Sequence, residues 1–219
     1  MSSPLPRSLS RPVDRELVIK RSRFLAHLAP ASDAAAADAV VGRVRTERWD
    51  ARHHCLAVVL GVQADTQRSS DDGEPTGTAG VPMLEVLRHR RMTDVVAVVS
   101  RYFGGVLLGA GGLVRAYSGA VAAALDDAEQ DGAILARRRL VEVTLDAPHA
   151  DAGRLEHLLR DWAAAHGAVV AHTQYGESAR LTLLVPPGDV DRLRHDVAAA
   201  TAGRLTPTAG GERVVDVPA

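Results

Sequence analysis

The sequence of 219 residues contains few cysteines, lysines or aromatic residues. Its single cysteine, Cys55, excludes an intramolecular disulfide framework and any zinc site built from several cysteines, and is typical of a reducing cytosol. No apolar run approaches the roughly 20 residues that a membrane-spanning helix needs. The first segment, residues 1–13, is rich in Ser, Pro and Arg, which predicts a disordered tail and not a signal peptide. We therefore expect a soluble, cytoplasmic protein.

An excess of charge of one sign is also absent. The chain has 26 Lys and Arg residues against 27 Asp and Glu, a formal net charge of −1. A protein with this balance does not bind nucleic acid through overall attraction, so any contact with RNA must come from a local patch. Lys20 is the only lysine, so nearly every cationic site carries a guanidinium, which suits bidentate contacts with carboxylate or phosphate.

Two successive patterns predict an α+β fold with two domains. The first domain, residues 14–134, includes the continuous apolar run Val95–Val99, which is typical of a strand buried on both faces. The second, residues 135–219, has the β-α-β-β-α-β order of a ferredoxin-like split β-α-β unit. Within the first domain, Glu16–Leu28 predicts a single strand, and the polar stretch Gln63–Gly80 predicts a loop.

A basic cluster lies on that first predicted strand. Side chains alternate between the two faces of a strand, so Arg21 and Arg23 would share one face, and Lys20 and Ser22 the other. This arrangement is typical of a solvated face of an edge strand, and it also supplies cations for an anionic partner.

An acidic loop, residues 70–80, carries three carboxylates within four residues: Asp71, Asp72 and Glu74. Such groups repel one another unless a cation, an arginine or water relieves them. The functional interpretations are Mg²⁺ ligation, general acid–base catalysis or docking of a basic partner. The structural interpretation is a solvated turn that caps the next helix. The spacing of an EF-hand is absent.

A glycine turn follows the buried strand and precedes a predicted helix. It contains Gly104, Gly105, Gly109, Gly111 and Gly112. Bare backbone N–H groups in this position can hold an anion, although the third glycine of a dinucleotide fingerprint and the Lys-Ser/Thr of a P-loop are missing. The alternative is a turn needed only for tight strand–helix packing.

Two arginines, Arg101 and Arg115, flank the glycine turn and favour the anion interpretation. Each of these guanidiniums is either free for phosphate or paired with the acidic loop. We expect Asp72 or Glu74 to lie within salt-bridge reach of one of them.

The motif His53-His54-Cys55 invites a catalytic interpretation. On a strand, however, His53 and Cys55 lie about 7 Å apart on one face, too far for the direct contact that a Cys–His dyad needs. We therefore expect Cys55 to be a buried, unreactive thiol. The other histidines have no spacing that indicates a metal site, and no cofactor is expected.

Together these motifs resemble those of the IMPACT/YigZ family, in the same order and along the whole chain: Lys20-Arg21-Ser22-Arg23-Phe24, His53-His54-Cys55, the acidic loop with Thr78-Ala79-Gly80, and Arg101 to Tyr117. The one difference of note is Leu56, where an aromatic residue often stands. The resemblance implies a first domain like those of a ribosomal protein and an elongation factor, with a left-handed β-α-β crossover, and a ferredoxin-like second domain.

The resemblance also implies a link to translation. Eukaryotic relatives regulate translational initiation by binding an activator of a stress kinase, and bacterial relatives have been linked to nucleic acid or ribosomes. We therefore expect a non-enzymatic regulator that binds RNA, the ribosome or a translation-factor protein. We do not expect it to bind a membrane. The contact surface would comprise the glycine turn, Arg21, Arg23, Arg101 and Arg115. The alternative is an Mg²⁺-dependent enzyme acting on a phosphorylated small molecule or nucleotide, with the metal on Asp71, Asp72 or Glu74.

Overall fold

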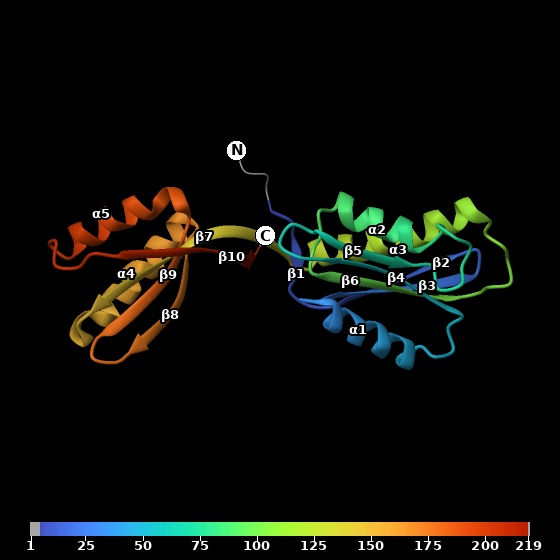
Figure 1. Ribbon diagram of the computed structural model, residues 1–219, viewed down its shortest axis with the longest axis horizontal. Coiled ribbons are helices and arrows are strands. Elements are labelled where there is room, and N and C mark those ends of the chain that lie inside the picture. Colours follow the sequence, from blue (N-terminus) through green and yellow to red (C-terminus); the bar gives the residue numbers. More distant parts are fainter. Residues whose placement is uncertain (1–4, 219) are drawn as a thin grey trace. The chain divides into compact units, whose positions relative to one another are not determined.

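The computed structural model describes residues 5–218 (Figure 1). The chain forms two compact units, one from residues up to 137 together with those from 216 onward, the other from residues 138–215. Each unit combines helices with an antiparallel sheet, which confirms the predicted α+β class with two domains. The predicted boundary, residue 135, falls near the start of strand β7 (Ile134–Ala147). Among residues 5–218, no helix has the length and apolar character needed to cross a membrane.

The first unit is built on a five-stranded sheet in the order β2-β3-β6-β4-β5. Its strands are β2 (Val13–Ile19), β3 (Ser22–Pro30), β6 (Val95–Tyr102), β4 (His53–Leu60) and β5 (Thr66–Ser70). Both β3 and β4 run antiparallel to β6, so they are parallel to each other and need a crossover connection. Helix α1 (Ala34–Glu47) supplies it, where the resemblance implies the left-handed crossover.

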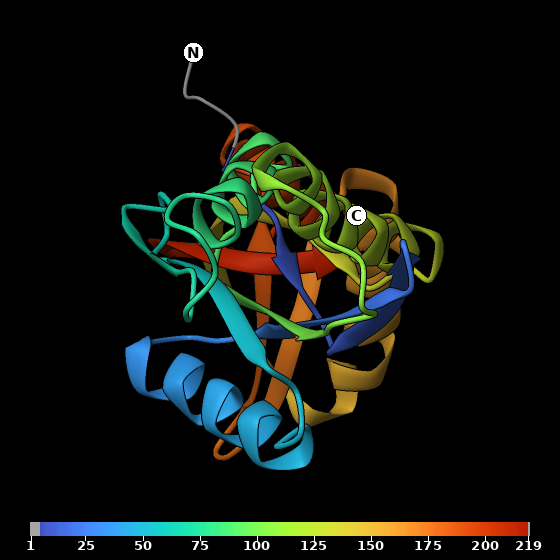
Figure 2. The same cartoon turned by 90° about the vertical axis from the view of Figure 1, so that its right-hand side faces the viewer.

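Helices cover both faces of this sheet (Figures 1 and 2). Helix α1 packs on one face, and α2 (Gly80–His89) and α3 (Ala110–Gln130) pack on the other. The apolar run Val95–Val99 on β6 is fully buried, with alternate residues in the two separate cores. Burial of each large apolar side chain contributes roughly 1.5–3 kcal/mol, so β6 is the strand on which both cores depend.

The N-terminal segment differs from the disordered tail expected over residues 1–13. Strand β1 (Ser8–Leu9) pairs with the start of β7, and Leu9 and Val13 are buried in the first core. The Arg7 guanidinium donates to the carbonyl oxygen of Arg90. These contacts join residues more than 80 positions apart, so local composition does not reveal them. Residues 1–4 lie outside the described part of the chain.

The predicted strand over Glu16–Leu28 is instead a hairpin of β2 and β3. Its two-residue turn is Lys20-Arg21, and Arg21 therefore does not share a strand face with Arg23. Both turn residues have positive φ, 46° and 66°, as in the type I′ turns that usually carry Asn or Gly. The turn was missed because neither residue is one of the usual turn formers.

The predicted loop over Gln63–Gly80 contains one further strand, β5, which pairs with β4 at the sheet edge. Its sequence, Thr-Gln-Arg-Ser-Ser, is polar because most of the strand is exposed to solvent. The remainder of the stretch forms the acidic loop and leads into α2.

The second unit has the predicted β-α-β-β-α-β order. Its elements are β7, α4 (His149–His166), β8 (Val169–Tyr175), β9 (Ala179–Val185), α5 (Val190–Ala200) and β10 (Thr208–Pro218). The strand order β10-β7-β9-β8 is that of a ferredoxin-like sheet. Its core contains the buried side chains of Leu155, Leu159, Leu181 and Leu193.

The hairpin turn generates a stability prediction. A non-glycine residue in the left-handed region costs roughly 1–2 kcal/mol, part of which glycine's extra unfolded-state freedom offsets. The variant Arg21→Gly should therefore raise the free energy of unfolding by about 0.5–1 kcal/mol, measured by urea denaturation. The control Arg23→Gly, inside β3 on the same hairpin, should lower it. A destabilised Arg21→Gly variant would contradict the assigned strain.

Candidate functional site

One end of the first sheet brings together segments that are distant in the sequence. Strand register places His53 of β4 opposite Arg101 of β6, and Arg23 of β3 opposite Tyr102. The β2–β3 turn, the start of β4 and the end of β6 therefore lie at the same sheet end, where the glycine turn begins. We call it the basic sheet end, defined by Lys20, Arg21, Arg52, Arg101 and Phe103.

A buried ion pair joins the acidic loop to this sheet end. Glu74 Oε1 accepts from an Arg101 terminal nitrogen at 2.6 Å and from the Tyr117 hydroxyl at 2.8 Å. The side chains of Arg101 and Glu74 are only 8% and 3% exposed. This contact confirms the expectation that Asp72 or Glu74 reaches Arg101 or Arg115. Burial raises the pKa of the Tyr117 hydroxyl, which keeps it protonated as a donor.

Aromatic rings surround the Arg101 guanidinium. Its central carbon lies 5.5 Å from the ring centre of Phe24 and 5.7 Å from that of Phe103, within the range of a cation–π contact. Phe24 in turn packs edge-on against Tyr117. The buried Arg101 Nε has no hydrogen-bond partner among the described residues.

The other two acidic-loop carboxylates hold the loop itself. Asp71 accepts from the backbone N–H groups of Gly77, Ala79 and Gly80, at 2.8, 3.0 and 2.8 Å. Partial burial alone would raise the pKa of Asp71, but these three donors outweigh it and hold the pKa below its usual value. Asp71 thus organises the entry into α2, as the structural interpretation of the loop predicts.

Asp72 bridges α1 and β4 instead of meeting the glycine turn. One carboxylate oxygen accepts from Arg45 at 2.7 Å, and the other accepts from the His54 backbone N–H at 2.6 Å. Its φ of 43° is positive, in the left-handed region that Asp adopts more readily than most non-glycine residues. Among residues 5–218, no group of three or more His, Cys, Asp or Glu side chains is placed to hold a metal ion.

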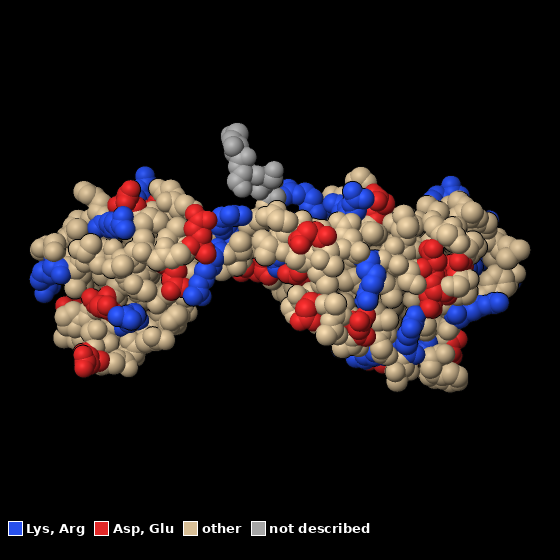
Figure 3. Space-filling model, viewed as in Figure 1, with Lys and Arg blue, Asp and Glu red and all other residues tan. Residues whose placement is uncertain are grey.

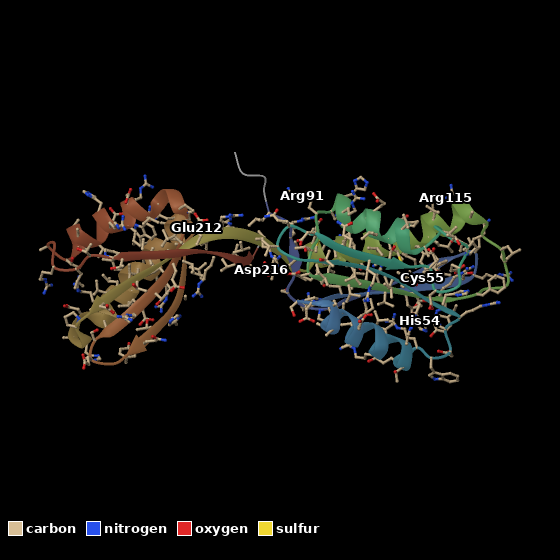
Figure 4. All side chains as sticks on the ribbon, viewed as in Figure 1. His54, Cys55, Arg91, Arg115, Glu212 and Asp216 are labelled. Atoms are coloured by element: carbon tan, nitrogen blue, oxygen red, sulfur yellow. The ribbon has the colours of Figure 1, made fainter. Side chains whose placement is uncertain are left out.

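The three residues of the His-His-Cys motif have separate environments, and Figure 4 labels His54 and Cys55. His53 Nδ1 donates to the Asp72 carbonyl at 2.8 Å, which leaves Nε2 as its free ring nitrogen. His54 is buried beside Ser100, and burial lowers its pKa. Cys55 is fully buried, and its thiol donates to the Asp71 carbonyl at 3.0 Å. The expected burial of Cys55 is confirmed.

A pocket of about 270 Å³ opens at the basic sheet end. Phe103 and Leu107, both exposed, form its apolar walls, and the side chains of Arg52, His53 and Arg101 complete it. Its volume is just below the roughly 300–1,000 Å³ of typical small-ligand sites. The pocket therefore combines apolar surface with cationic and hydrogen-bonding groups.

The glycine turn has a packing role at its first position. A side chain at Gly104 would meet the Arg21 backbone at 2.0–2.2 Å, so only glycine permits this approach. The Gly104 N–H donates to Ser22 Oγ at 3.1 Å and is not free for an anion. Gly105 and Gly109 both have positive φ, and Gly109 is the N-cap of α3. Gly111 and Gly112 lie in the first turn of α3.

Charge pairing separates the cations of the first unit into two groups. Most arginines are in ion pairs with carboxylates, including Arg23 with Glu16 at 2.6 Å, and positive and negative groups intermix on the visible face (Figure 3). In contrast, four cations have no ion-pair partner within the described chain: Lys20, Arg21, Arg52 and Arg115.

The structure brings together only part of the predicted surface. Arg21, Gly104 and Arg101 lie at the basic sheet end, whereas Arg23 is paired with Glu16 and Arg115 lies on the outer side of α3 (Figure 4). Sequence reasoning missed Arg52 as a site residue. Its position just before the His-His-Cys strand was the available signal, but its proximity to Arg101 depends on strand register.

Comparison with known proteins finds two family matches. Residues 20–125 match the Impact N-terminal domain, and residues 145–204 match a domain of unknown function (DUF1949). A Haemophilus influenzae IMPACT family member is 35% identical over 189 residues, 85% of this chain and 88% of that protein. A crystal structure of a hypothetical protein is 35% identical, with a TM-score of 0.58, and covers 97% of this chain and 100% of the other.

Two further bacterial relatives match over shorter spans. IMPACT family member YvyE of Bacillus subtilis is 42% identical over 148 residues, 68% of this chain and 66% of that protein. IMPACT family member YigZ of Escherichia coli is 54% identical over 109 residues, 49% of this chain and 53% of that protein. The matched segments thus span just under two thirds and about half of these relatives.

The buried ion pair generates a stability prediction. Removing one partner of a buried pair leaves an uncompensated charge, so Arg101→Met should lower the free energy of unfolding by about 3–5 kcal/mol. The double variant Glu74→Gln with Arg101→Met leaves no buried charge and should be more stable than Arg101→Met alone. Urea denaturation of the single and double variants measures both effects. If the loss of stability in the double variant equals the sum of the losses in Arg101→Met and Glu74→Gln, the two charges do not compensate each other.

Burial of the Cys55 thiol generates a pH prediction. Burial raises its pKa from 9.0 to about 12 in the folded protein. Because the folded pKa is the higher, its stabilising contribution is complete below pH 9 and is lost as the pH rises toward 12. Between pH 8 and pH 10 the wild type should lose about 1.4 kcal/mol more stability than Cys55→Ala. The control Val59→Ala, a buried change without a titrating group, should follow the wild type. Equal losses in wild type and Cys55→Ala would contradict the raised pKa.

Proposed function

The chain belongs to the IMPACT family, and from this premise we propose that it is a non-enzymatic, cytosolic regulator linked to translation that binds RNA through its first unit. One observation carries the proposal. Of the four cations without an ion-pair partner in the described first unit, Lys20, Arg21 and Arg52 lie at the basic sheet end, beside the exposed Phe103.

Unpaired cations favour an anionic partner for electrostatic reasons. An arginine already bonded to a carboxylate has little potential left to offer a phosphate, whereas an unpaired guanidinium or ammonium releases counterions when phosphate binds. With a net charge of −1 the whole chain gives no long-range attraction, so binding must depend on these few groups. The proposed contact is therefore local and modest in affinity.

The spacing of the cations suits an extended strand. Neighbouring strands lie about 4.8 Å apart, and β3 and β4 are separated only by β6, so the Lys20-Arg21 turn and Arg52 are about 10 Å apart across the sheet. Arg115 lies roughly 8 Å along α3 from the first residue of the helix, which follows the glycine turn. A single strand that passes this sheet end can contact the Lys20-Arg21 turn and Arg52, and it reaches Arg115 where it continues along α3.

The link to translation is supported by family membership alone. The Bos taurus protein named Protein IMPACT is 34% identical over 105 residues, 45% of this chain and 32% of that protein. Such a match supports a shared domain rather than a shared whole-protein role. The unpaired cations favour RNA, free or in the ribosome, as the partner, and a translation-factor protein is the second partner that the resemblance implies.

The alternative, an Mg²⁺-dependent enzyme on a phosphorylated small molecule or nucleotide, has weaker support. It needs Asp71, Asp72 or Glu74 as metal ligands. Asp71 is engaged by three backbone donors, Asp72 by Arg45 and a backbone N–H, and Glu74 by Arg101 and Tyr117. Ligation would require breaking these bonds, so the RNA proposal is preferred.

Salt dependence tests the proposal directly. Each phosphate contact to single-stranded nucleic acid contributes about 0.7 to the slope of log affinity against log salt, so four cations predict a slope of about −3. Arg52→Ala and Arg115→Ala should each weaken binding of a labelled single-stranded RNA and reduce the slope by about 0.7, in fluorescence anisotropy titrations.

The matched control is Arg88→Ala, which removes the same charge from an arginine of α2 paired with Glu85. It should leave both affinity and slope unchanged. RNA binding that is absent, that does not depend on salt, or that falls equally in Arg88→Ala would overturn the proposal.

A further inference from the structure

The pocket at the basic sheet end carries a more specific inference, which rests on the proposed function. We propose that it holds the base of one unpaired nucleotide of the bound RNA strand, with Phe103 and Leu107 against the base and Arg52 at a flanking phosphate.

Exposed apolar side chains point to a planar apolar ligand. Phe103 is 44% exposed and Leu107 is 83% exposed, although both belong to a short loop between a buried strand and a helix. A neighbour in the same loop, Val106, is also exposed, at 38%. Aromatic side chains that present a face to solvent are typical stacking platforms for the bases of single strands.

The polar groups of the pocket suit a nucleotide rather than a purely apolar ligand. Arg52 and Arg101 offer N–H donors, and the free His53 Nε2 can accept a hydrogen bond when the ring is neutral. The Arg101 side chain is more than nine-tenths buried at the pocket wall, with Nε unpartnered, and Glu74 fixes its other end. A base has donors and acceptors on its edge, and its phosphate needs donors only.

The size of the pocket selects an unpaired base. At about 270 Å³ it has room for one ring system with part of its sugar, and not for a base pair. In a duplex the faces of each base are already stacked, so neither Phe103 nor Leu107 could reach one. Duplex RNA can therefore use the surrounding cations but not the pocket.

The neighbouring cations continue the strand away from the pocket. Gly104 lies against the backbone of Arg21, so the Lys20-Arg21 turn adjoins the residue that follows Phe103. The phosphate on one side of the held base would thus contact Arg52, next to β4. The phosphate on the other side would contact the Lys20-Arg21 turn, next to β3. The negative backbone of RNA complements this arrangement. Among the acidic side chains nearby, Glu16, Asp72 and Glu74 are paired with arginines, and Asp50 accepts a hydrogen bond from the Tyr102 hydroxyl.

Anisotropy titrations of the full chain test the inference with a labelled single strand of about ten nucleotides, within the site sizes of ~4–16 nucleotides known for stacking platforms. A blunt duplex of the same length is the comparison probe. Phe103→Ser and Leu107→Ser should each weaken single-strand binding, roughly 10-fold for Phe103, and leave the salt slope and duplex binding unchanged. Phe103→Tyr, which keeps a ring, should bind like the wild type.

The matched control is Val81→Ser, a 50% exposed apolar residue on α2, which should have no effect. Both pocket residues are exposed, so thermal melting should show that their variants remain folded. Three results would overturn the inference. The first is wild-type RNA affinity in Phe103→Ser, and the second is equal binding of duplex and single strand by the wild type. The third is displacement of RNA by an acidic peptide in a manner that depends on Phe103. If Arg52→Ala still reduces the salt slope in the first two cases, the proposed function stands without the nucleotide pocket. Loss of all salt-dependent RNA binding would overturn both.

Discussion

The buried contact between Glu74 and Arg101 is the interaction on which the arrangement of the site depends. It joins the acidic loop to the end of β6, and Tyr117 extends it to α3, so three elements meet at one carboxylate oxygen. Because burying one charge without the other is costly, neither segment can move away alone. The wall of the pocket is therefore held before any ligand arrives, which reduces the entropy lost on binding.

The acidic loop illustrates how a cluster of carboxylates can organise a cationic site without binding a metal. Asp71 holds the loop through backbone donors, Asp72 neutralises Arg45, and Glu74 neutralises Arg101. With these arginines paired, Lys20, Arg21, Arg52 and Arg115 are the cations of the described first unit without an ion-pair partner. The result is a surface of almost zero net charge with a few free cations at one end, which favours selective over general attraction to polyanions.

Much of the fold could be predicted from local patterns, and the Glu74–Arg101 pair could be predicted from crowded charges in two motifs. The hairpin of β2 and β3 could not be predicted, because Lys20-Arg21 has no turn-forming residue. Strand β5 could not be predicted either, because an exposed edge strand lacks apolar alternation. The contribution of Arg52 to the pocket also could not be predicted, because strand register is what places Arg52 beside Arg101.

The return of the chain to the first unit brings the two ends of the ferredoxin-like unit together. Arg137 donates to Asp94 at 2.6 Å and to Asp216 at 2.8 Å, and all three belong to the first unit. Residues 138–215 thus leave and rejoin the first unit at two residues that touch each other. A unit whose two ends lie close together places little constraint on the fold to which it is joined. The two ends of the ferredoxin-like unit are therefore fixed to each other by the ion pair of Arg137 with Asp216.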